Sequence, residues 1–142
     1  MNSVSMEPGP LFNSSRAPRT FVVISTFWQL TSDHSQLPMD RIAALNEILT
    51  EHPTDAFARY GLAMEYSKQG DLDRALAEFS ILLENNPDYT AGYFMAAQTL
   101  TRAERAADAK KMLQDGIAAA RRTGNLHAQS EMEAMLAELT AS

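Results

Sequence analysis

The sequence predicts an all-α fold in which a helix–turn–helix unit repeats along the chain. In residues 56–87, small, large and turn-forming residues follow one another in an order typical of two packed helices. Much of this pattern returns 34 residues later, where Ala63 recurs as Ala97 and Ala75 as Ala109. A period of about 34 residues indicates a solenoid of stacked helical hairpins.

Composition and charge narrow the possible functions. The 142 residues suffice for one domain, and 45% hydrophobic with 21% charged residues is ordinary for a globular protein. The absence of cysteine excludes a disulfide framework and thiol catalysis, and it suits a reducing compartment. Residues 1–38 hold two basic and two acidic residues, so residues 39–142 carry 10 basic and 16 acidic ones and the whole net charge of −6. An acidic domain without a basic stripe is a poor partner for nucleic acid.

Residues 1–38 differ in composition from the rest of the chain. They contain four of the six prolines with scattered serine and threonine, which argues against long helices. Their apolar run, residues 20–30, is shorter than the roughly 20 residues that span a bilayer, and no small-residue cleavage site follows it. We therefore expect a non-repeat N-terminal tail, disordered or loosely attached, ahead of a repeat domain over residues 39–142. We expect a cytoplasmic protein without a membrane partner.

Capping and turn residues divide the repeat domain into six helices. We expect them over residues 39–51, 55–68, 71–85, 88–101, 105–122 and 125–139. Side chains that can cap helix N-termini are present at Asp40, at Thr54 or Asp55, at Asp71 and at Asp88. Gly70 and Gly124 can adopt the left-handed conformation that ends a helix.

Residues 39 to about 122 resemble the tetratricopeptide repeat (TPR) family. The residues that carry this resemblance in the first full copy are Leu62, Ala63, Tyr66, Gly70, Ala75, Phe79, Leu82 and Pro87. Arg121 departs from the pattern, because it occupies a proline position in the second copy. The resemblance implies a short right-handed helical-repeat solenoid: a half repeat, two helix–turn–helix repeats and a capping helix. It also implies a scaffold or module for protein–protein interaction.

A second apolar stripe on the helix 55–68 provides candidate binding residues. Phe57, Tyr60 and Met64 are spaced by three and four, which places them on one side of the helix. Packing inside the repeat does not require this side. The equivalent stripe of the next repeat includes Phe94 and Gln98. The corresponding positions in the last helix hold Asn125, Ala128 and Met132.

The family resemblance assigns this stripe to a groove. In TPR proteins the first helix of each repeat lines a concave face that contacts an extended or helical ligand. The residues expected to contact a protein or peptide partner are Phe57, Tyr60, Met64, Lys68, Phe94, Gln98 and Arg102. Lys68 and Arg102 correspond by the 34-residue shift and would bind acidic groups of that partner. The alternative is a core role, in which Phe57 and Tyr60 cover the helix 39–51 and Met64 packs on Phe94.

No catalytic, cofactor-binding or metal-binding residues are predicted. His34, His52 and His127 lack the spacing of metal ligands, and the glycines are too isolated for a phosphate-binding loop. No nucleophile motif surrounds a serine. We therefore expect that the protein is not an enzyme and uses no cofactor.

Self-association is the second function that the sequence leaves open. The helix 39–51 lacks the upstream neighbour that a complete repeat would supply. Its apolar residues Ile42, Leu45 and Ile48 could pack against a second copy and form a homodimer.

Overall fold

The computed structural model describes residues 38–142, and it contains six α-helices and no strand in that range. The helices are α3 (Pro38–Glu51), α4 (Ala56–Gln69), α5 (Leu72–Asn85), α6 (Thr90–Arg102), α7 (Ala106–Thr123) and α8 (Leu126–Ala141). The predicted all-α repeat fold is confirmed. The expectation of a loosely attached tail falls on residues outside the described range and stays a prediction.

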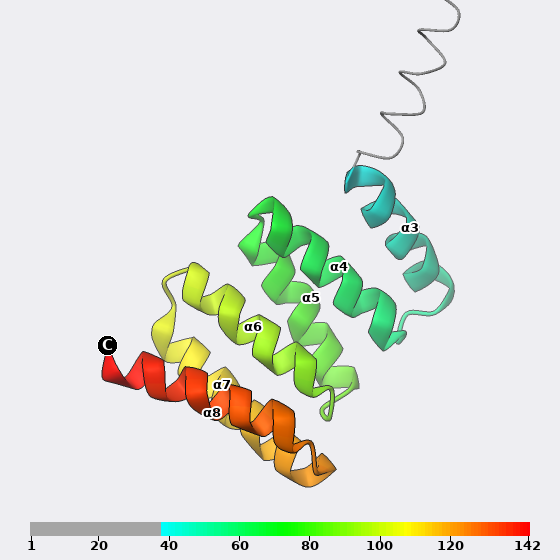
Figure 1. Ribbon diagram of the computed structural model, residues 1–142. Coiled ribbons are helices and arrows are strands. Elements are labelled where there is room, and N and C mark those ends of the chain that lie inside the picture. Colours follow the sequence, from blue (N-terminus) through cyan, green and yellow to red (C-terminus); the bar gives the residue numbers. More distant parts are fainter. Residues whose placement is uncertain (1–37) are drawn as a thin grey trace, which may run out of the picture. The chain divides into compact units, whose positions relative to one another are not determined.

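The helices of the compact unit Arg41–Ser142 are arranged as two rows (Figure 1). α4 packs against α5 and α6 packs against α7, while α5 also contacts α6 and joins the two pairs. α8 packs on α7 and lies beside α6. One row therefore contains α4, α6 and α8, and the other contains α5 and α7.

Small residues stand where the helices of a pair approach most closely. Ala63, Ala75, Ala97 and Ala109 are all fully buried. The space between the helices is filled by large side chains that are also fully buried, which are Leu62, Phe79, Leu82, Leu113 and Met132. The 34-residue alternation of small and large residues is thus the packing pattern of the core.

Most of the predicted helix ends are confirmed by hydrogen bonds and backbone angles. The Asp55 carboxylate accepts a hydrogen bond from the Ala58 amide at 2.8 Å, and Asp71 caps α5 in the same way. Gly70 and Gly124 end α4 and α7 with φ of 83° and 69°, angles that favour glycine over other residues.

Two predicted N-caps are wrong. Asp40 lies inside the first turn of α3, which begins at Pro38. α6 begins at Thr90 after Tyr89, so Asp88 is too far upstream to cap it. The Asp88 carboxylate instead receives two hydrogen bonds from the Arg122 guanidinium, and this contact links the α5–α6 turn to the end of α7.

α3 is attached to α4 by a small apolar cluster. Leu49 is buried against Ala58 and Leu62, and Ile42 and Leu45 are half-buried beside them. Among residues 38–142, no helix is both long and apolar enough to cross a membrane.

Candidate functional site

The row of α4, α6 and α8 carries a chain of three hollows, and the first lies between α3 and α4. It has a volume of about 490 Å³. Its lining is mostly apolar with a charged end, and consists of Arg41, Ala44, Leu45, Phe57, Tyr60, Gly61, Met64, Glu65 and Lys68. Four of the seven predicted binding residues are therefore brought together in one place.

The second and third hollows continue the first along α6 and α8. The second has a volume of about 220 Å³ and shares Tyr60 with the first hollow. The third has a volume of about 350 Å³ and shares Phe94 and Glu131 with the second. Gln98 lines the third hollow. Because each hollow shares a residue with the next, we treat the three as one surface and call it the groove.

Arg102 is the one predicted binding residue that lines none of the three hollows. It lies at the end of α6, where its guanidinium donates a hydrogen bond to the Ser67 hydroxyl at 2.8 Å. Ser67 precedes Lys68 on α4, so Arg102 does reach the helix that carries the other predicted basic residue.

The aromatic residues of the groove differ in exposure. Phe57 is 78% exposed, which is unusual for so large an apolar side chain. Tyr60 is half-buried and packs on Phe79 and Tyr89, with ring centroids 6.2 and 5.5 Å away. Burial, together with the neighbouring Tyr89, raises the pKa of Tyr60. Tyr60 is thus partly core, but its ring contacts lie on α5 and the α5–α6 turn and not on the helix 39–51 as the alternative had it, whereas Phe57 is surface.

The charged end of the first hollow was only partly predictable. Lys68 lies 3.6 Å from Glu65, and Arg41 on α3 lies 3.0 Å from the same carboxylate. Glu65 is buried although it is charged, because it is shared between these two cations. The spacing of Glu65 and Lys68 by three residues was the available sequence signal for one of these contacts.

The α8 side of the groove differs from the sequence prediction. Asn125 and Ala128 line the second hollow as expected, but Met132 is fully buried in the core. The third hollow instead receives Glu131 and Glu138 from α8. The sequence did not indicate these glutamates, because the rotation of α8 is set by Met132, whose burial depends on the helices before it.

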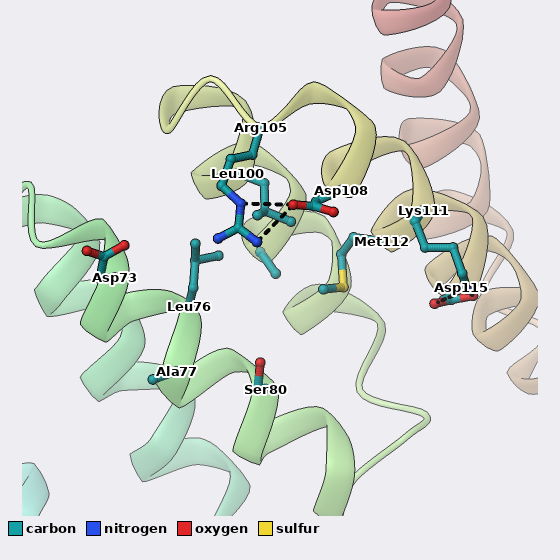
Figure 2. Close-up of a pocket in the computed structure, with 11 residues that line it drawn as sticks. Asp73, Leu76, Ala77, Ser80, Leu100, Arg105, Asp108, Lys111, Met112 and Asp115 are labelled. Atoms are coloured by element: carbon teal, nitrogen blue, oxygen red, sulfur yellow. Dashed lines mark hydrogen bonds and ion pairs between the residues drawn. The ribbon is translucent and has the colours of Figure 1, made fainter.

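A separate hollow of about 480 Å³ lies on the other row, between α5 and α7 (Figure 2). Its floor includes Leu76, Leu100 and Met112. Its charged rim is largely neutralised by ion pairs along α7, namely Arg105 with Asp108 and Lys111 with Asp115. No sequence motif indicated this hollow. Within residues 38–142, no group of three histidine, aspartate or glutamate side chains could hold a metal ion.

Comparison with known proteins defines the family. A TPR repeat-containing protein of Pseudomonas aeruginosa is 30% identical to this chain over 98 residues, which make up 69% of this chain and 93% of that protein. No family model matches the chain. Identity at this level over nearly the whole relative shows that the chain belongs to the TPR family.

Two solved structures show the same fold. The solution structure of a tetratricopeptide repeat domain protein from Salinibacter ruber has 36% identity and a TM-score of 0.59, and the match covers 61% of this chain and 88% of that one. The TPR2B domain of yeast Sti1, solved as a complex with pHsp70, has 17% identity and a TM-score of 0.68. That match covers 82% of this chain and 90% of the Sti1 chain, and it supports the fold alone.

Proposed function

We propose that the protein is a non-catalytic interaction module that binds a segment of a partner protein in the groove. The observation that carries the proposal is the exposure of Phe57 at the edge of a large hollow with an apolar lining. Binding sites typically combine such an apolar hollow with a few polar groups. The absence of cysteine is consistent with action in the cytoplasm.

The shape of the groove supports an elongated ligand. The three hollows follow one another across α3, α4, α6 and α8, so a single extended or helical segment can occupy them in sequence. The Sti1 domain that shares this fold was solved in complex with pHsp70. The shared fold supports the binding of a protein segment by this chain as well.

The basic residues lie at the end of the groove near α3. Lys68 and Arg102 are exposed, and each still has donors directed to solvent beyond its bond to Glu65 or Ser67. Arg41 adds a third positive charge at this end. The single Glu65 carboxylate balances one of the three, so two positive charges remain. We propose that they bind an acidic group of the partner, in an interaction that weakens with salt.

The test of this function is a peptide selection followed by truncation of Phe57. Peptides are selected from a random displayed library on the 142-residue chain, and their binding to variants is measured by fluorescence anisotropy. Phe57→Ala should weaken binding by about 2 kcal/mol, or roughly 30-fold, if Phe57 is a hot spot. The fold should persist because the side chain is exposed.

Ile81→Ala is the matched control. Ile81 is 37% exposed on α5 and lines none of the groove hollows, so its truncation should leave peptide binding unchanged. Selected peptides that bind Phe57→Ala and wild-type protein with equal affinity would show that the groove is not the binding site.

A further inference from the structure

We propose that the partner segment carries a lysine or arginine that binds in the third hollow, between Glu131 and Glu138. This inference rests on the proposed function of the groove and specifies the chemistry of its ligand. It assigns opposite charge preferences to the two ends of the groove, with a cation at the α6–α8 end.

The third hollow combines acidic groups with an apolar floor. Phe94 and Met135 line it, and both are half-buried against the core that includes Met132. Glu131 and Glu138 stand at its sides on the exposed part of α8. A long cationic side chain fits such a place, because its methylene groups pack on apolar surface while its charged end stays near carboxylates. A cation close to the Phe94 ring also gains attraction from the ring face.

The two carboxylates are not neutralised within the domain. In the part of the chain that the structure describes, Glu138 has no cationic partner, and His127 is the one basic side chain near Glu131. The His127 Nε2 lies 3.4 Å from the Glu131 Oε2, and this histidine is charged only when protonated. By contrast, Glu133 on the same helix is paired with Arg121 at 3.0 Å and lies outside the groove.

The charges at the two ends of the groove are opposite in sign. The first hollow holds Arg41 and Lys68 around the single Glu65, whereas the third hollow holds two glutamates and no basic residue. A ligand with a cation at one end and an apolar or acidic part at the other is therefore favoured in one orientation. The net charge of −6 over residues 39–142 also attracts a basic segment at long range.

The experiment compares two selections from the random peptide library. One selection uses the wild-type 142-residue chain and the other uses the Glu131→Gln/Glu138→Gln variant. We expect lysine or arginine beside the apolar residues of peptides selected on wild-type protein, and no such enrichment on the variant. Replacing that cation by glutamine in a synthetic peptide should weaken wild-type binding about threefold to tenfold, as expected for two exposed ion pairs.

A matched variant separates a local effect from net charge. Glu47→Gln/Glu84→Gln removes the same number of charges from exposed glutamates that line no hollow of the groove. It should preserve the preference for the cationic peptide, whereas Glu131→Gln/Glu138→Gln should abolish it. If both variants lose the preference for the cationic peptide, that preference comes from long-range charge and the assigned site is wrong.

The outcomes also distinguish this inference from the proposed function. If binding depends on Phe57 but the glutamine-substituted peptide binds as well as its parent, the groove stands and the cation site is wrong. If the selected peptides are insensitive to Phe57→Ala, the groove itself is not the binding site and the cation site fails with it.

Discussion

At the scale of single residues, two glycines inside helices show how local space decides which side chain is tolerated. Gly116 lies on α7 at a crossing where an added Cβ would stand 2.6 Å from the Tyr93 Cβ and 2.5 Å from the Met132 Sδ. Gly61 lies on α4, where an added Cβ would meet the Leu45 side chain at 3.3 Å. At Gly116 the added Cβ would meet the Tyr93 Cβ, whose position is fixed by the backbone. At Gly61 it would meet the end of the half-buried Leu45 side chain, which can shift.

Alanine substitution should therefore have opposite effects at these two glycines. Both changes gain about 1 kcal/mol of helix propensity. Gly116→Ala also incurs overpacking, which commonly costs about 1–3 kcal/mol, so we expect a lower melting temperature than that of the wild type. Gly61→Ala should be neutral or stabilising. Thermal unfolding followed by circular dichroism gives the melting temperatures of the two variants. Equal melting temperatures would contradict the packing described at the α7 crossing.

At the scale of elements, α3 is held less firmly than the helices that follow it. Among the side chains of residues 40–51, Leu49 is the one that is buried, and the rest of the contact consists of half-buried residues. α4 and α5 are joined in addition by an ion pair between Arg59 and Glu78 at 2.6 Å, with both side chains largely shielded from solvent. The half repeat is thus an end element with one neighbour in the described chain.

Hydrogen exchange should reveal this difference in local stability. Amides of α3 should exchange through openings of lower free energy than those at the centres of α6 and α7, because fewer buried contacts are lost when α3 detaches. Native-state exchange measured by NMR or mass spectrometry compares the helices within one sample. Equal protection of α3 and α6 would show that the half repeat folds as an inseparable part of the solenoid.

At the scale of the whole molecule, sequence periodicity was sufficient for the fold. The recurrence of Ala63 and Ala75 at Ala97 and Ala109 located the close helix crossings, and Gly70 marked a helix end correctly. Such features depend on neighbours within one repeat. Periodicity could not place residues whose partners lie in another element.

The parts of the site that escaped prediction depend on such distant partners. Glu65 is buried because Arg41 of another helix shares its charge. Outside the groove, Asp88 likewise faces Arg122, which follows it by 34 residues. The rotation of α8 is set by Met132 entering the core, and this rotation turns Glu131 toward the groove. The stripe on α4 was predictable because it rests on helical spacing alone.

Self-association through α3 is also a question about the whole molecule. Of the three apolar residues that the sequence made candidates for this contact, Ile42 and Leu45 are half-buried against α4. Ile48 is 43% exposed and is the one of the three that faces mainly solvent. A stable protein interface buries about 800 Å² on each partner, far more than one isoleucine provides.

We therefore expect the 142-residue chain to be a monomer. Light scattering at several concentrations should return the mass of one chain, 15.7 kDa, throughout. A mass that rises with concentration would contradict this expectation, and two variants would then locate the contact. Loss of the larger species in Ile48→Glu would assign self-association to α3, as the second sequence hypothesis holds. Loss in Phe57→Glu would instead show that the groove binds a second copy of this chain.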